Sequence, residues 1–155
     1  MAKRVMEFAN TVQVDRSAAD VFAVVSDLSG LFGKLRRKVS LEAEREVGEG
    51  APAAGDVWRV SGNTQFGRRR GVIEVTGMTA PTIVSFRSMA RGFSVDTQIM
   101  IAAVGPAKCR VTAQNDVFAT TFGARLLAPV IKPWRGWAKN RLGRGLQRLK
   151  KRLER

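Results

Sequence analysis

Residues 71–88, GVIEVTGMTAPTIVSFRS, contain the clearest structural pattern in this chain. Apolar and polar side chains alternate on both sides of the APT turn, which is typical of two half-buried β-strands joined by a tight connection. The same period of two continues outward in both directions, with breaker residues between the segments. The strand candidates are 39–47, 56–62, 70–78, 82–89, 93–104 and 108–118. Six consecutive strands with short connections predict an antiparallel meander.

The segment before the meander predicts a strand followed by a helix. Residues 5–15, VMEFANTVQVD, alternate in the same way and are interpreted as a further strand. Ser17 then stands where it can cap a helix of about ten residues that ends near Ser29 and Gly30. A second short helical or irregular piece, GLFGKLRRK at 30–38, leads into the meander.

The pattern changes to a helical period from Thr120 onward. Apolar residues recur every three or four positions through residues 122–153, with arginine and lysine opposite them. This spacing predicts one long amphipathic C-terminal helix. Pro129 and Pro133 each remove a backbone donor and clash with the preceding turn, so we expect a kink there, or a short first segment that ends before the main helix.

Length and composition indicate one globular domain over residues 1–155. The chain has 45% hydrophobic and 26% charged residues, which is an ordinary globular mixture. Its 27 basic and 13 acidic residues give a net charge of +14, and residues 121–155 alone contain 11 basic residues and one acidic residue. A charge of this size favours polyanions or anionic membranes as neighbours but carries no information about the fold.

Several site classes are excluded by the residue types that the sequence lacks. There is no histidine, so imidazole cannot serve as a metal ligand, general base or pH switch. Cys109 is the only cysteine and lies in an alternating apolar pattern, which indicates a packed strand residue. No apolar run is long enough to cross a bilayer or to form the core of a signal peptide, and we expect a soluble, cytoplasmic protein.

The order of elements and three local sequences resemble the START-like or SRPBCC superfamily, which includes polyketide cyclase/dehydrase-like proteins. The resemblance lies in VQVDRSAADVFAVVSDL at 12–28, in GVIEVTGMTAPTIVSFRS at 71–88, and in QRLKKRLE at 147–154. It implies the α+β helix-grip fold. In this fold a curved seven-stranded antiparallel sheet wraps around a long C-terminal helix, here about 122–153, with two short helices after the first strand.

The resemblance also implies a cavity between sheet and helix. Strand alternation and the helical stripe predict its ligand-binding wall: Trp58, Val60, Phe86, Val95, Thr97, Asn115, Leu126 and Val130. The parity of a simple meander places three connections at one edge of the sheet, which would be the cavity mouth. The predicted rim residues are Phe66, Arg68, Arg69, Arg70, Arg91 and Phe122. Arginines of this kind suit a phosphate or carboxylate. The alternatives are that the wall residues are ordinary core and that the arginines form a solvated hairpin tip.

The sequence therefore favours binding, transport or sensing of a hydrophobic or amphipathic molecule such as a lipid, quinone or polyketide. The first alternative is a polyketide cyclase/dehydrase-type enzyme, although no catalytic residue, metal site or cofactor is assigned, because the ionisable strand residues alternate onto the outer face. The second alternative is contact of the basic C-terminal helix with an anionic membrane or with nucleic acid. Nucleic-acid binding beyond non-specific attraction is not expected.

Overall fold

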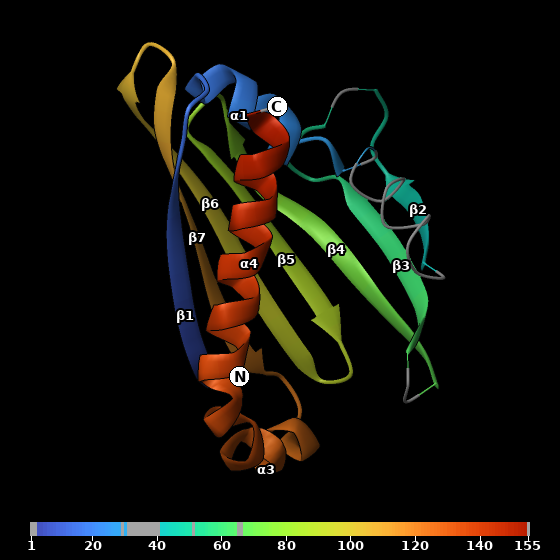
Figure 1. Cartoon of the computed structure of the whole chain (residues 1–155). Coiled ribbons are helices and arrows are strands. Elements are labelled where there is room, and N and C mark those ends of the chain that lie inside the picture. The colour runs from blue at the N-terminus through green and yellow to red at the C-terminus, as the bar shows by residue number, and fades with distance from the viewer. Residues whose placement is uncertain (1–2, 29, 31–40, 51, 65–66, 155) are drawn as a thin grey trace.

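The computed structural model describes residues 3–28, 30, 41–50, 52–64 and 67–154, which form a seven-stranded antiparallel sheet with helices on one face (Figure 1). The spatial order of the strands is β1-β7-β6-β5-β4-β3-β2. Their bounds are β1 Lys3–Val14, β2 Leu41–Val47, β3 Val57–Thr64, β4 Gly67–Thr79, β5 Ile83–Ala90, β6 Phe93–Gly105 and β7 Lys108–Ala119. The meander predicted from the alternating pattern and the helix-grip fold implied by the resemblance are thus confirmed. β1 pairs with β7, at the opposite end of the sheet from β2.

The sheet is bent by register shifts in four of its strand pairs. The shifts occur at Arg4/Met6, Arg45/Val47, Val75/Gly77 and Ala103/Gly105. An extra residue on one strand bends it and increases its twist, so these irregularities curve the sheet around the helix side.

Helix α1, Ala18–Val25, forms where the sequence predicts it. The Ser17 side chain accepts a hydrogen bond from the backbone N–H of Asp20 at 3.2 Å, which satisfies one of the unpaired donors of the first turn. Val21 is fully buried, and Phe22 and Val25 pack against the core. Most of the second short helical piece expected at 30–38 lies outside the described residues.

The C-terminal region consists of two helices rather than one. Helix α3 covers Phe122–Ile131, the 3-10 turn η1 covers Lys132–Trp134, and helix α4 covers Arg135–Leu153. Pro129 lies inside α3 and Pro133 inside η1. Because Pro133 cannot donate to the preceding turn, the helix breaks there, and the short first segment allowed by the sequence is observed.

Helix α4 lies along β1, the edge strand of the sheet (Figure 1). The backbone carbonyl groups of β1 accept hydrogen bonds from side chains of α4: Arg135 Nε donates to Glu7 O at 2.6 Å, and Lys150 Nζ donates to Gln13 O at 2.8 Å. In the opposite direction Asn10 Nδ2 donates to Lys139 O at 3.2 Å. Cationic side chains of the helix thus cover the open edge of β1, which would otherwise expose unpaired backbone groups.

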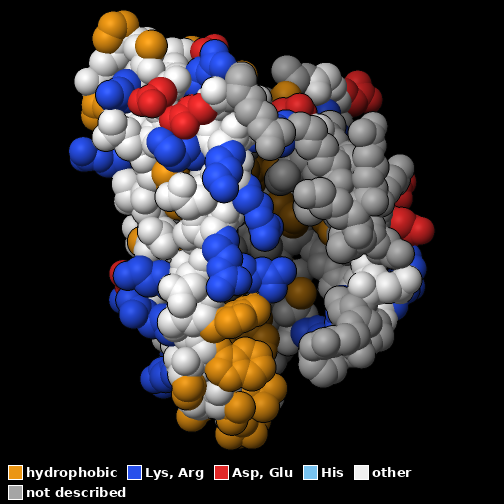
Figure 2. Space-filling model, in the orientation of Figure 1, with side chains coloured by type: hydrophobic (Ala, Val, Ile, Leu, Met, Phe, Trp, Pro, Cys, Tyr) orange, Lys and Arg blue, Asp and Glu red, His pale blue; other side chains and the backbone are white. Residues whose placement is uncertain are grey.

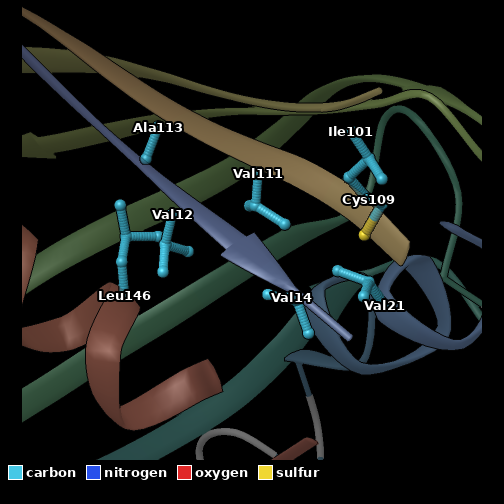
Figure 3. Close-up of a cluster of buried hydrophobic side chains, with 8 residues drawn as sticks. All are labelled: Val12, Val14, Val21, Ile101, Cys109, Val111, Ala113 and Leu146. Carbon is cyan, nitrogen blue, oxygen red and sulfur yellow. The ribbon is translucent and has the colours of Figure 1, made fainter. Parts of the chain in front are cut away.

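Gly143 lies where α4 comes close to β1. A Cβ atom at this position would lie 2.7 Å from Asn10 Nδ2, so a larger residue would displace the Asn10 amide, which donates to Lys139 O. One helical turn further on, Leu146 is buried and points to Val12 (Figure 3). It belongs to a cluster with Val14, Val21 and residues of β6 and β7, namely Ile101, Cys109, Val111 and Ala113. The predicted packing of Cys109 in a strand is confirmed.

None of the helices in the described part of the chain is long and apolar enough to cross a membrane.

Candidate ligand cavity

The part of the helix side of the sheet that α4 does not cover carries a second apolar cluster. Trp58 of β3 pairs with Ile73 of β4, and Val75 of β4 pairs with Phe86 of β5, so these side chains share the helix side of the sheet. Trp58, Val75, Val84 and Phe86 are buried together with Leu28, which follows α1. The buried members of this cluster are distinct from those of the one under Leu146. The cluster adjoins a cavity, because Val60 and Ile73 pack against it and also line the cavity.

The cavity has a volume of about 480 Å³ and lies at the end of β3, β4, β5 and β6. This volume falls within the range of small-molecule sites. Most of the lining side chains are apolar or small. The lining residues are Val60, Ser61, Gly62, Asn63, Arg69, Arg70, Gly71, Val72, Ile73, Ser88, Met89, Ala90, Phe93 and Val95.

The predicted wall residues on the sheet fall into three groups. Val60 and Val95 line the cavity. Trp58 and Phe86 are buried in the adjacent cluster, each 9% exposed. Thr97 and Asn115 lie opposite each other on β6 and β7, and the Thr97 hydroxyl donates to Asn115 Oδ1 at 2.7 Å. This hydrogen bond explains how a polar amide can be buried among the apolar side chains of the sheet.

The two wall residues predicted on the helix are placed differently. Leu126 is 64% exposed and Val130 is 62% exposed, and both face solvent from α3. The small residues Ala124 and Ala128 face the sheet instead, where they pack with Val5 and Ala119. The prediction that Leu126 and Val130 line the cavity is therefore wrong, because the helical stripe chosen from residue size is not the stripe that packs.

Two of the three connections predicted to form the cavity mouth contact each other: the β5–β6 turn and the junction between β7 and α3. Thr120 N donates to Gly92 O at 2.7 Å, so the β5–β6 turn lies against the start of α3. Arg91 and Gly92 both have positive φ in this turn, and a Cβ at Gly92 would lie 2.5 Å from Thr121 Oγ1. The rim residue Phe122 follows directly and is 76% exposed. Phe66, also predicted at the rim, lies outside the described residues.

The three consecutive arginines are divided between the two faces of the sheet. β4 begins at Gly67, so residues 68–70 are part of the strand and alternate. Arg69 shares the helix side with Gly71 and Ile73 and lines the cavity. Arg68 points to the other side, where its guanidinium donates to Glu42 Oε2 at 2.8 Å and to Ser61 Oγ at 3.1 Å.

A shallow groove of about 1380 Å³ lies largely on that outer side and was not predicted from the sequence. Its wall includes two glutamates and four arginines, together with polar residues of β3; the charged residues are Glu42, Glu44, Arg59, Arg68, Arg70 and Arg91. The alternation of Glu42 and Glu44 on β2 with Arg59 and Ser61 on β3 was the available signal, because these residues pair across the two strands.

The ionisable groups with displaced pKa values lie away from the cavity. Arg87 donates to Asp96 Oδ1 at 2.8 Å on the outer face, and this hydrogen bond raises the pKa of the arginine. Burial raises the pKa of the Cys109 thiol. Within the described ranges, no three acidic or cysteine side chains come together as a metal site.

Comparison with known proteins identifies the family of this architecture. The family model described as polyketide cyclase/dehydrase and lipid transport matches residues 6–154. No curated protein matches the chain.

Solved structures share the fold at low sequence identity. A START superfamily protein from Mycobacterium smegmatis is 17% identical, with a TM-score of 0.67 over 95% of this chain and 98% of that one. A protein from Thermus thermophilus is 18% identical, with a TM-score of 0.62 over 95% and 96% of the two chains. A norcoclaurine synthase point mutant from Thalictrum flavum, in complex with a transition state analogue, is 14% identical; its TM-score is 0.61 over 99% and 94%.

Proposed function

Because the chain belongs to the polyketide cyclase/dehydrase and lipid transport family, we propose that it binds a hydrophobic or amphipathic small molecule in the cavity formed by β3, β4, β5 and β6. The family is known for binding hydrophobic small molecules. The observation that carries the proposal for this chain is the apolar cavity of about 480 Å³ beside the Trp58 cluster.

The lining side chains support burial of an apolar ligand body. Val60, Ile73, Phe93 and Val95 offer hydrocarbon surface, and transfer of apolar ligand surface from water to such a wall is favourable by roughly 25 cal/mol per Å². No Asp or Glu is among the described residues that line this cavity.

Arg69 gives the cavity a preference for a ligand with an acidic end. Arg69 and Arg70 both line the cavity, and Arg69 is the one that shares its side of β4 with Ile73, whereas Arg68 is engaged by Glu42. A guanidinium can hold a carboxylate or phosphate through two parallel hydrogen bonds. The proposed ligand is thus an apolar molecule with one acidic group, carried or sensed rather than converted.

Two fluorescent probes test this proposal: 1-anilinonaphthalene-8-sulfonate, which is apolar and anionic, and Nile red, which is apolar and uncharged. Val95→Phe fills the cavity and should weaken binding of both probes at least tenfold. Val104→Phe, the same change at an exposed position of β6, should leave binding unchanged. Arg69→Gln should weaken only the anionic probe. If Val95→Phe bound each probe as tightly as the wild type does, the probes would bind at another site.

Native mass spectrometry of protein purified from its own source would name the ligand class. A stoichiometric co-purifying molecule is the expected result. A chemically altered molecule released after incubation of the protein with that compound would instead indicate the enzyme alternative.

A further inference from the structure

The α3–α4 end of the molecule exposes a group of large apolar side chains, which we call the apolar end face. Its members are 51–76% exposed: Phe122, Leu126, Leu127, Val130, Trp134 and Trp137. Figure 2 shows apolar side chains gathered at this end, with lysine and arginine side chains beside and above them. Contiguous exposed patches of this kind are rare on soluble monomers and mark interaction sites.

The orientation of α3 that exposes these side chains is fixed by packing on its other side. Phe122, Leu126 and Val130 are spaced by four residues and share one stripe of the helix. The opposite stripe contains Ala124 and Ala128, which are buried in a cluster with residues of β1, β7 and β6. Turning α3 to bury the larger residues would separate these alanines from the sheet. The Thr121 cap, which accepts from Ala124 N at 3.2 Å, also fixes the start of the helix.

The C-terminal helices contribute charges of one sign to the apolar end face. Residues 121–153 contain ten basic side chains and no acidic one, and five of them are exposed and lie among the residues of this face in the chain or follow them within two helical turns: Arg125, Lys132, Lys139, Arg141 and Arg144. Arg141 lies over the Trp137 ring at 5.3 Å. In the described part of the chain none of the five forms an ion pair with a carboxylate, so their charges are available to an external anion.

We propose that the apolar end face docks this protein on an anionic lipid bilayer. Tryptophan and leucine side chains insert at the boundary between headgroups and acyl chains, and the surrounding cations contact lipid phosphates. The charge complementarity selects a bilayer with anionic lipid as the occupant. A second copy of this chain would bring the same positive charges together, which opposes association.

The docking surface adjoins the proposed ligand cavity through Phe93. This residue lines the cavity and also packs with the cluster under α3. Docking on a bilayer would therefore hold the cavity end of the sheet near the membrane surface. The docking proposal does not depend on ligand binding, and the two are tested by different variants.

Vesicle co-sedimentation tests the proposal, with phosphatidylcholine vesicles containing either 0% or 30% phosphatidylglycerol. The wild type should bind the anionic vesicles at least tenfold more tightly. Trp134→Ser/Trp137→Ser should weaken that binding at least tenfold, because both indoles are more than half exposed and belong to none of the buried clusters. Val47→Ser/Val104→Ser removes two exposed apolar side chains elsewhere and serves as the matched control. Arg141→Gln/Arg144→Gln should lose about fivefold per charge on anionic vesicles only.

Insertion is measured separately with phospholipids brominated on the acyl chain. Quenching of tryptophan fluorescence should be strong in the wild type and largely lost in Trp134→Ser/Trp137→Ser, in which only Trp58 remains. Vesicle binding that is equal in that variant and in the wild type would overturn the proposal, since adsorption would then come from net charge alone. A self-associated form that needs Trp134 and Trp137, without vesicle binding, would overturn it in favour of a second copy of the chain.

Discussion

Truncation of Leu146 to alanine should destabilise the protein far more than the same truncation of Leu126. Both residues lie in helices, so the change in helix propensity is the same and the difference reports burial. Leu146 is 7% exposed and fills the space between α4 and β1, whereas Leu126 is 64% exposed on α3. The pair therefore measures how the C-terminal helices sit on the sheet.

The magnitude follows from the groups removed. Loss of three buried carbons at about 0.8 kcal/mol each gives roughly 2.4 kcal/mol for Leu146, and the cavity left behind raises this to about 3 kcal/mol. For Leu126 only about a third of the same surface is buried, which gives roughly 0.8 kcal/mol. In a domain of this size the Leu146 change corresponds to a decrease in Tm of about 6–12 °C.

Urea denaturation followed by circular dichroism at 222 nm gives both free energies of unfolding. The slope of free energy against urea concentration should be unchanged in both variants. A cost at Leu126 equal to that at Leu146 would show that the large residues of α3 pack on the sheet, contrary to the orientation described above. A cost below about 1 kcal/mol at Leu146 would show that α4 is not seated over β1.

Three further predictions concern single side chains. The buried Cys109 thiol, whose pKa is raised by burial, should react with 5,5′-dithiobis(2-nitrobenzoic acid) only at the rate of unfolding; fast labelling of folded protein would contradict its position in the core. Ser17→Ala should lower the free energy of unfolding by about 1 kcal/mol through loss of the α1 cap, measured by urea denaturation against Ser17→Asn, which keeps the cap. The pKa of Glu154 is lowered by hydrogen bonds from Lys150 and from the backbone of Asp15, so its stabilising contribution is present above the ordinary glutamate pKa and is lost as pH falls through the lowered one. The stability difference between wild type and Glu154→Gln should accordingly be larger at pH 6 than at pH 3; an equal difference at both would mean that these hydrogen bonds do not form.

The strand pattern was predictable because a half-buried strand repeats every two residues. Trp58 and Val60, or Val84 and Phe86, had to share a face once their segments were strands.

The run of arginines at 68–70 shows how a small error in a strand boundary changes a predicted site. A strand beginning at residue 70 leaves Arg68 and Arg69 together in a turn, whereas a strand that begins at Gly67 sends them to opposite faces.

The sequence by itself determined the order of the elements, the cap of α1 and an interruption of the C-terminal helix near Pro129 and Pro133, because these depend on local backbone geometry. Only the tertiary structure decided which side of α3 meets the sheet. Both of its stripes are apolar, and helical periodicity shows that Leu126 and Val130 share a face without showing what that face contacts. The close fit of Ala124 and Ala128 on β1 and β7 settled the choice and left the larger residues exposed.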